Sequence, residues 1–454
     1  MAFSPLDSGL TGPLFTTAAM RDVFADRAFV AAMLQVEAAL AQAEAVHGLA
    51  PSELAAAIRA IDPDSLDMAA LAAGTALSGV VVIPFVKAVQ GRLPPELESA
   101  FHRGATTQDI ADTALVLQLR AALDLIAHDL GAVMDALARM AAAHRMTPCA
   151  GRTYGQHAAP VTFGFRAAVW LVGLADLADA LPGVRERALV ASLGGPVGTL
   201  AGLGSAGPAV LEAYAATLGL AAPPLAWHTR RAGMAEAAAW LARLAGALGK
   251  MAGDVAFLSS TEVGEVSEPY VPGRGGSSAM PHKRNPVSST VILAAAQAAL
   301  GPASALTAAM VAAQERPAGA WHAEWHAIPT LCGLVAGALA EARRLAEGLV
   351  VHPARMQVVL DMTGGLLFAD QAAALLAPRC GRAAAHALVE AAAGTVRDRG
   401  GTLLDALAAR PDLPAGVDRA VLAAAFDPSP AVAAAATFVD RALVSAERSR
   451  SRLS

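Results

Sequence analysis

The sequence predicts an all-α protein. Two long segments repeat apolar residues at alternating steps of three and four, which is the spacing that keeps side chains on one face of a helix. A third segment, residues 291–313, is rich in alanine and carries no charged side chain. No segment shows the strict two-residue alternation of a half-buried strand. Helices must therefore supply most of the structure.

The predicted helices follow in order along the chain. A short helix is expected where Phe29, Met33, Val36 and Leu40 recur at helical spacing, and Gly48 marks its end. The two long helices are defined by the apolar series Val116, Leu119, Leu123, Ile126, Leu130, Val133, Leu137 and Met140, and by the series Leu241, Leu244, Leu248, Met251, Val255 and Leu258. Such long apolar seams are typical of a helix bundle.

Residues 291–313 have the length of a membrane span, but their composition favours a different role. Alanine is by far the most frequent residue among them, the polar residues Gln297, Ser304 and Thr307 lie among them, and Gly301-Pro302 interrupts the helix. Small side chains let helices approach one another closely. We therefore expect a buried helix at the centre of a bundle and no contact with a membrane.

The pattern divides the chain into three helical domains. Residues 1–110 form an N-terminal helical domain, residues 111–350 a central long-helix bundle, and residues 351–454 a C-terminal helical domain that opens near Pro353. The long seams expose more apolar surface than one chain can cover, so the protein is expected to oligomerise.

Composition narrows the class of protein. The net charge of −5 at pH 7 argues against nucleic acid as the main partner, so an anionic ligand must meet a local cationic pocket. Cys149, Cys332 and Cys380 are few and widely spaced, which suits a reducing cytoplasm and gives no metal-ligand spacing. The first residues lack the basic and apolar pattern of a secretion signal. We expect a cytoplasmic enzyme that needs no metal or other cofactor.

The segment Gly276–Pro286, with the sequence GSSAMPHKRNP, carries the most chemistry. Glycines at and before its start allow the backbone to close over a ligand and reopen. Ser277 or Ser278 can move a proton, and Lys283 and Asn285 can hold negative charge as it develops on a carboxylate. A glycine-serine linker followed by a solvated Lys-Arg pair is the plain alternative, but linkers do not usually run into Met-Pro-x-Lys-x-Asn-Pro.

Two further segments carry polar residues of the same kind. His102–Thr113 contains Thr106 and Thr107 at an expected helix start, where hydroxyls and backbone amides can hold a carboxylate. Taken alone, the two threonines are a helix-capping pair. Gly151–Gly164 contains Tyr154, Gln156 and His157.

Together these three segments resemble the signature regions of the fumarase/aspartase superfamily. Members of this superfamily make or break a bond β to a carboxylate through an aci-carboxylate intermediate. The resemblance implies a homotetramer around a twenty-helix core, with each active site shared between three chains. It extends over most of the chain and is closest to the branch that lactonises carboxylated muconates, through the segments Ile83–Ala88, Trp227–Thr229, Thr261–Val266 and Gly319–Trp325.

The resemblance also implies roles for individual residues. Ser277 is the expected proton carrier, with Lys283 and Asn285 stabilising the aci-carboxylate. The residues expected to bind the substrate, a small tricarboxylate, are His102, Thr106, Thr107, Gln156, Ser278, Met280 and Arg316. Arg316 is included because a guanidinium grips a carboxylate with two parallel bonds.

The chain departs from the superfamily pattern at the general acid. Tyr154 occupies the place of a histidine, and Thr290 the place of the glutamate that orients it, so both halves of the acid/base pair are missing. Hydroxide and amines leave poorly unless protonated, whereas a carboxylate, whose conjugate acid has a pKa of about 4, leaves as a stable anion. The loss of this acid/base pair predicts a lactonising cycloisomerase. When such an enzyme runs in reverse and opens the lactone, the leaving group is a carboxylate of the substrate itself.

Several alternatives stay open at this stage. Tyr154 either donates a hydrogen bond in the site or packs in place of an imidazole, and His157 is either catalytic or a lone histidine at a helix start. Ala232 and Gly233 follow Arg231 where relatives read Arg-Asp-Arg, which removes an acid and a base near the expected pocket and leaves a sulfonated muconate possible.

Two other functions compete with lactonisation. An elimination of the adenylosuccinate type would need a substitute acid, and Val80 stands where that branch has a histidine. A non-catalytic structural member of the fold is disfavoured because Ser277, Lys283 and Asn285 are intact.

Overall fold

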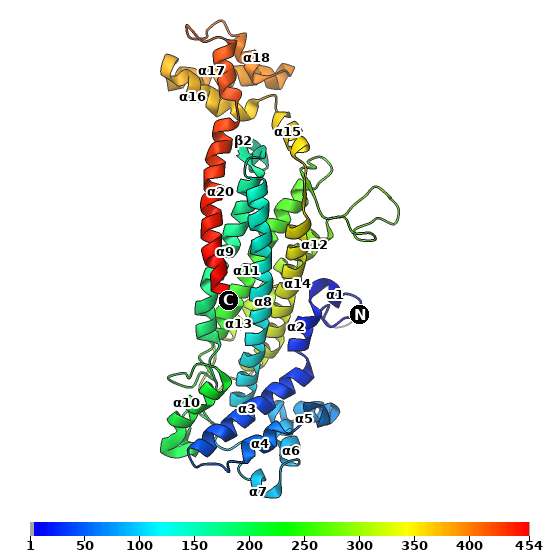
Figure 1. Ribbon diagram of the computed structural model, residues 1–454, viewed down its shortest axis with the longest axis vertical. Coiled ribbons are helices and arrows are strands. Elements are labelled where there is room, and N and C mark those ends of the chain that lie inside the picture. The colour runs from blue at the N-terminus through cyan, green and yellow to red at the C-terminus, as the bar shows by residue number, and fades with distance from the viewer. Residues whose placement is uncertain (1–3, 454) are drawn as a thin grey trace.

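The computed structural model describes residues 4–453 as an elongated, almost wholly helical molecule (Figure 1). The all-α prediction is confirmed. Among the described residues, strands are confined to two small antiparallel pairs, β1 (Pro148–Thr153) with β2 (Gln156–Thr162), and β3 (Val266–Ser267) with β4 (Val350–Val351). The β1–β2 hairpin is important because it carries part of the candidate site.

A bundle of long helices forms the middle of the molecule (Figure 1). Its members are α8 (Thr107–Ala143), α9 (Phe163–Ala188), α11 (Ala232–Leu258), α12 (Val287–Ala298), α13 (Leu300–Ala308), α14 (Ala320–Gly348) and α20 (Ser429–Arg450). The apolar series predicted for α8 and α11 are buried in one continuous core, from Val116 to Met140 and from Leu241 to Leu258. The prediction of two long bundle helices is therefore confirmed.

Short helices pack at the lower end of the bundle in Figure 1. They are α4 (Leu54–Arg59), α5 (Met68–Ser78), α6 (Val82–Gln90), α7 (Pro95–Glu98) and α10 (Gly207–Leu218), together with the longer α3 (Asp26–Val46). Helices α1 (Gly12–Phe15) and α2 (Ala18–Val23) lie beside the middle of the bundle, where both contact α14. The helix predicted around Met33 and Leu40 is α3, which ends two residues before Gly48. A second core joins α3 to α6 and to Tyr214 of α10, so a segment from the middle of the chain completes this unit.

The opposite end carries α15 (Pro353–Asp361), α16 (Ala369–Cys380), α17 (Arg382–Arg399), α18 (Leu403–Ala408) and α19 (Arg419–Ala423). Helices α16–α19 share a separate small core. The chain then returns, because α20 runs back along the bundle beside α9 (Figure 1), and Val439 and Ala446 belong to the central core. The three-domain division with boundaries near residues 110 and 350 stays a prediction.

The alanine-rich segment differs from its prediction in one respect. It forms two helices, α12 and α13, which meet at Ala299, just before Gly301-Pro302. Val291, Ile292 and Ala295 are buried, but Leu300 is 61% exposed and Val311 is 87% exposed. Within residues 4–453, the expectation of a buried helix therefore holds for only one face of the segment, and its other face is exposed.

In the part of the chain that the structure describes, four helical segments have the length and apolar composition of membrane spans, namely Asp26–Val46, Phe163–Ala188, Val287–Ala308 and Arg419–Leu453. The most apolar stretches of the first two are 67% and 56% buried within the molecule, so packing accounts for much of their composition. The corresponding share is 28% for the other two, which leaves apolar helix surface open to further contacts.

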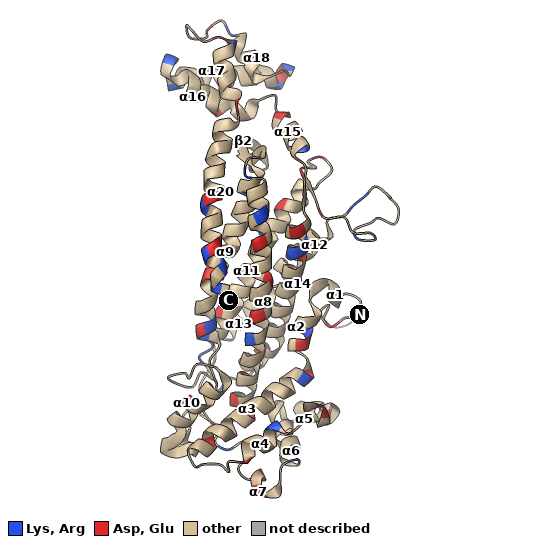
Figure 2. Cartoon of the chain, in the orientation of Figure 1, with Lys and Arg blue, Asp and Glu red and all other residues tan. Residues whose placement is uncertain are grey.

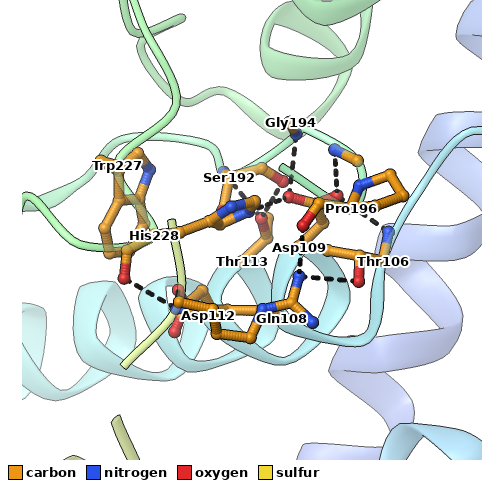
Figure 3. Close-up of polar contacts among 12 residues, drawn as sticks. Thr106, Gln108, Asp109, Asp112, Thr113, Ser192, Gly194, Pro196, Trp227 and His228 are labelled. Carbon is orange, nitrogen blue, oxygen red and sulfur yellow. Dashed lines mark hydrogen bonds and ion pairs between the residues drawn. The ribbon is translucent and has the colours of Figure 1, made fainter. Parts of the chain in front are cut away.

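Short 3-10 turns complete the backbone. They are Pro63–Ser65, Ala201–Ala206, Leu366–Phe368, Ala424–Phe426 and Ser451–Leu453. The turn at Ala201–Ala206 follows a glycine-rich segment, residues 192–198, here called the glycine loop. This loop lies against the start of α8 (Figure 3).

Candidate active site

The first signature region caps the start of α8. Thr106 is the N-cap residue, and its backbone N–H donates to Asp109 Oδ2 at 2.9 Å. Thr107 is the first residue of the helix and is half-buried. Arg316, from the segment before α14, donates from Nη2 to Thr106 Oγ1 at 2.9 Å and to the carbonyl oxygen of Pro196 at 3.3 Å. The structure thus brings the predicted anchors Thr106 and Arg316 together.

His102 lies just ahead of this cap in a left-handed backbone conformation, with φ of 58°. Its Nδ1 is 2.6 Å from Glu37 Oε1 on α3. Burial alone would lower the pKa of His102, but attraction to Glu37 and hydrogen bonding to it prevail, with smaller help from Asp109, and the pKa is raised. The raised pKa favours the imidazolium form, which pairs with Glu37 beside the helix cap.

The second signature region forms the β1–β2 hairpin. Tyr154 and Gly155 make its two-residue turn, with φ of 52° and 78°, which is the pattern of a type I′ turn. The Tyr154 side chain is fully exposed at the tip, and Gln156 next to it is also exposed. Tyr154 therefore has no packing role within one chain, and its role, as hydrogen-bond donor or as packing residue, stays a prediction about the assembled site.

Charge pairing holds the hairpin close to its turn. Arg152 on β1 makes two bonds to the buried Glu265 carboxylate, at 2.9 and 3.1 Å. His157 is the cross-strand partner of Arg152 and lies on a strand, not at the helix start expected for it. Burial and the neighbouring Arg152 cation lower the pKa of His157, so it favours the neutral form.

The third signature region is a loop that projects from the side of the bundle before α12 (Figure 1). Its neck is closed by Asn285 N–H, which donates to Gly275 O at 2.8 Å, and by a bridge between Gly276 and Arg284. Within the loop, Ser277 Oγ accepts from the backbone N–H groups of Ala279 at 3.3 Å and Met280 at 3.1 Å. These two donors stabilise negative charge on the serine oxygen.

The loop presents its other functional groups to solvent. Ser278, Met280, Lys283 and Asn285 are all exposed. Residues 269–286 contain Arg274, Lys283 and Arg284 and no acidic residue, which makes this projection cationic (Figure 2). A substrate with several carboxylates is attracted to such a surface.

The helix that follows the loop is anchored by a carboxylate. Glu268 accepts from the backbone N–H groups of Ser288 at 3.0 Å and Ser289 at 2.8 Å, in the first turn of α12. Thr290, which occupies the place of the superfamily glutamate, is exposed and donates from its hydroxyl to Pro286 O at 2.8 Å. Its side chain is thus engaged with its own helix.

The three signature regions do not meet within one chain. The first lies at the N-terminal end of α8 and the hairpin follows its C-terminal end (Figure 1). Helix α8 has 37 residues, which corresponds to about 55 Å at about 1.5 Å per residue. Thr106, Thr107 and Arg316 are grouped at one end, far from Gln156 and Ser277.

Sequence reasoning missed several residues around the first region. Asp109 accepts from the backbone N–H groups of Gly194 and Gly195, both at 2.9 Å, and its Oδ1 lies 2.6 Å from Nε2 of His228 (Figure 3). The run Gly194-Gly195-Pro196-Val197-Gly198 was the available signal, since closely spaced glycines indicate a close backbone approach.

The segment around Arg231 has a structural explanation. Arg231 is buried, pairs with Asp112 at 2.7 Å and with Glu324, and stacks over Trp227 with its guanidinium carbon 4.4 Å from the ring centroid. Gly233 packs directly on the backbone carbonyl of Arg187, where a β-carbon would clash. Reading this departure only as a lost acid and base in the pocket was therefore incomplete, because packing also demands a glycine here.

No group of three or more His, Cys, Asp or Glu side chains within residues 4–453 is placed to hold a metal ion. The groups that the site offers are a serine held by amides, a lysine, amides and anion anchors. Such a set suits proton transfer and charge stabilisation at a carbon next to a carboxylate. The fold and these groups define a lyase-type enzyme that acts on carboxylates.

Comparisons with known proteins also indicate a lyase. The family model described as "Lyase" matches residues 15–301, and one described as "Adenylosuccinate lyase C-terminus" matches residues 365–442. The chain belongs to this lyase family, within the fumarase/aspartase superfamily.

Individual relatives are similar over most of their length. A 3-carboxy-cis,cis-muconate cycloisomerase of Pseudomonas putida is 47% identical over 83% of this chain and 90% of that protein. A nitrosuccinate lyase of Streptomyces davaonensis is 43% identical over 98% of this chain and 96% of that protein. The crystal structure of a 3-carboxy-cis,cis-muconate lactonizing enzyme from Pseudomonas putida superimposes with a TM-score of 0.92 at 44% identity, covering 97% of this chain and 100% of the other.

Proposed function

We propose that this protein is a cycloisomerase that lactonises 3-carboxy-cis,cis-muconate to a carboxymuconolactone, in the catabolism of protocatechuate. The observation that carries the proposal is the replacement of the superfamily's acid/base pair by Tyr154 and Thr290. A carboxylate leaving group, with a conjugate acid of pKa about 4, needs no general acid. The similarity to enzymes named for this reaction supports the same conclusion.

The reaction proceeds in two steps at one carbon pair. A substrate carboxylate oxygen forms a bond to a diene carbon, and the displaced electron pair moves onto the adjacent carbon and its own carboxylate. Lys283 and Asn285 stabilise this aci-carboxylate. Ser277 then delivers a proton to the carbon, and the two backbone amides that contact its oxygen stabilise the serine oxyanion that remains.

The remaining groups bind the substrate as anion anchors. His102, Thr106, Thr107 and Arg316 lie around the start of α8, and Gln156, Ser278 and Met280 belong to the other two regions. Because about 55 Å of α8 separates the first and second regions, a complete site requires other chains. We propose a homotetramer in which three chains build each site, working in the cytoplasm without metal or cofactor.

A second candidate function is the elimination of nitrite from nitrosuccinate. Nitrite, like a carboxylate, departs as a stable anion, so the missing acid fits this reaction as well. The nitrosuccinate lyase relative matches over 98% of the chain, including the C-terminal region. This reaction would use the same serine in the opposite direction, as the base that removes a proton next to a carboxylate.

Other reactions have weaker support. Adenylosuccinate cleavage expels an amine that needs protonation, and the match to an adenylosuccinate lyase model at residues 365–442 lies outside all three signature regions. A 3-sulfomuconate substrate would use the same chemistry, with a sulfonate in the place of one carboxylate. A purely structural role leaves Ser277, Lys283 and Asn285 without a purpose.

Incubation of the purified protein with each substrate tests the proposal. Loss of diene absorbance with 3-carboxymuconate, and no nitrite from nitrosuccinate or fumarate from adenylosuccinate, is the expected result. The Ser277→Ala protein is the control for a contaminating activity. Release of nitrite at a higher kcat/KM than lactonisation would move the assignment to the second candidate. We expect activity to survive treatment with a chelator, and its loss and recovery with a divalent ion would contradict the cofactor-free mechanism.

A further inference from the structure

Asp109 connects the start of α8 to the glycine loop, next to the predicted carboxylate-binding residues Thr106 and Arg316. Its side chain is fully buried and accepts three backbone N–H bonds, from Thr106, Gly194 and Gly195, each at 2.9 Å. These donors come from two segments far apart in the sequence, the start of α8 and the glycine loop. A carboxylate with these acceptor bonds ties the two segments together.

His228 supplies the fourth contact to Asp109. Its Nε2 lies 2.6 Å from Oδ1, and the imidazole is buried at 3% exposure. Because the Asp109 oxygens already accept amide hydrogens, Nε2 is the nitrogen that donates, which fixes the tautomer. The His228 carbonyl oxygen accepts from Gln108 Nε2 at 3.0 Å, so α8 also holds the backbone of His228 in place (Figure 3).

The segments tied by Asp109 are those that position Arg316. The guanidinium donates to Thr106 Oγ1 on the helix cap and to Pro196 O on the glycine loop. A shift of the loop relative to the cap would separate these two acceptors. Arg316 is itself exposed, so these contacts, and not packing around it, define its direction.

We propose that Asp109 and His228 are positioning residues for substrate binding: they clamp the glycine loop to the start of α8 and thereby hold Arg316 and Thr106 in the geometry that grips a substrate carboxylate. This inference rests on the proposed function, because it assumes a polycarboxylate ligand. Neither side chain contacts the substrate in this scheme. Their loss should affect substrate binding more than the chemical step.

The test compares two substitutions of His228 that differ in hydrogen bonding. His228→Leu removes the donor, whereas His228→Gln keeps an N–H group at nearly the same reach. We expect His228→Leu to raise KM for 3-carboxymuconate about tenfold or more, as for a hydrogen bond to a charged group, with kcat within about threefold. His228→Gln should restore KM to within about threefold of the parent.

A double variant shows whether the effect acts through Arg316. If it does, His228→Leu combined with Arg316→Ala should have the KM of Arg316→Ala alone, within about twofold. An unchanged KM in His228→Leu, or KM effects that multiply in the double variant, would overturn the proposal. Should His228→Leu fail to fold, Gly195→Ala carries the test, because its positive φ of 70° and its contact with Gly104 O displace the same loop.

Calorimetric titration with tricarballylate, a saturated tricarboxylate that cannot lactonise, separates this inference from the proposed function. Absence of turnover by the parent protein would contradict the function only. Weaker tricarballylate binding by His228→Leu, restored in His228→Gln, would still support the clamp. Equal binding by all three proteins, or no binding by the parent, would contradict it.

Discussion

In the proposed mechanism, single residues determine where the proton is transferred. Ser277 differs from an ordinary surface serine because two backbone amides point at its oxygen and Lys283 lies in the same loop. Tyr154, in the place of the superfamily acid, points away from its own chain at a hairpin tip. The contrast between these two hydroxyls is the most direct test of the mechanism.

Replacement of Ser277 by alanine removes the proposed proton carrier and leaves the anion anchors in place. We expect kcat to fall by at least about a hundredfold, the lower end of general acid–base contributions, with KM nearly unchanged. Steady-state lactonisation kinetics measure this. Activity close to that of the parent protein would assign the proton to another group.

Tyr154→Phe is the matched experiment at the other hydroxyl. A departing carboxylate needs no proton, so we expect a loss of less than about tenfold, or about 1.4 kcal/mol. The melting temperature should not change, because the ring is exposed in each chain. If Tyr154→Phe were as damaging as Ser277→Ala at equal stability, the tyrosine would be the acid–base group.

Glu44 gives a pH-dependent prediction about stability. Burial, reinforced by the nearby Glu37 carboxylate, raises the pKa of Glu44 to about 8. An unfolded glutamate ionises near a pKa of about 4.3, so between these values the folded state holds a proton that the unfolded state has lost. Stability from this group is therefore full below about pH 4 and falls as the pH rises toward 8.

Glu44→Gln imitates the protonated form at every pH. We expect its melting temperature to match that of the parent near pH 4.5 and to exceed it by about 2 °C or more at pH 8. Thermal unfolding at both pH values gives the comparison. A shift of equal size at both would show that packing, and not ionisation, is responsible.

At the residue level, the sequence was informative wherever a contiguous motif carried the chemistry. Ser277, Lys283 and Asn285 lie within nine positions, so no three-dimensional knowledge was needed to group them. Asp109 and His228 are separated by more than a hundred positions, and only the fold shows that they touch. The contact between His102 and Glu37 on α3 could not be predicted for the same reason, because the two residues are far apart in the sequence.

At the scale of elements, the shape of the signature loop depends on its neck, where Asn285 bonds to Gly275. Gly275 has a φ of 70°, and a β-carbon there would lie 2.6 Å from Asn285 O. Gly275→Ala therefore strains the backbone by about 1–2 kcal/mol and pushes Asn285 away. We expect kcat to fall about tenfold or more, with the melting temperature within about 2 °C, because the loop is exposed.

Gly276→Ala is the control for this prediction. The adjacent glycine has no positive φ and open space around it, so its replacement should cause a clearly smaller loss. Lactonisation kinetics and thermal unfolding of both variants provide the comparison. Equal losses would show that general flexibility of the loop is needed, and not the closed neck.

Among the elements, long helices were predictable and short or returning ones were not. The seams of α8 and α11 repeat over many turns, which gives a strong periodic signal. The β1–β2 hairpin was missed because its strands are short and its turn, Tyr154-Gly155, lacks the more familiar Asn-Gly pair. The return of α20 along α9 depends on a long-range contact that periodicity does not encode.

At the scale of the whole molecule, the separation of the three regions predicts complementation between chains. A mixture of inactive Gln156→Ala and Lys283→Ala proteins should regain activity, because some hybrid sites then draw every functional residue from an unmutated region. The assay is lactonisation after denaturation, mixing and refolding, with each variant alone as control. No recovery, once subunit exchange is verified, would place each site within one chain.

The apolar face of α12 and α13 is the part of the molecule that the sequence described least well. Its composition correctly indicated a helix against neighbours, but Leu300 of α13, and Val311 just beyond the end of α13, are exposed in the single chain. An apolar composition predicts that a helix surface will be buried. It does not tell whether the covering residues come from the same chain or from another.

The length of α8 has a consequence for how this protein can change. Each inserted residue would rotate everything beyond it by about 100° and shift it by about 1.5 Å. Since the two ends of α8 would serve two different sites, a single insertion would misalign the hairpin in one site relative to Thr106 in another. Even a seven-residue insertion, which nearly restores the rotation, would lengthen the helix by about 10 Å. Insertions or deletions within α8 should therefore not be tolerated, because the length of this helix sets the distance between two sites.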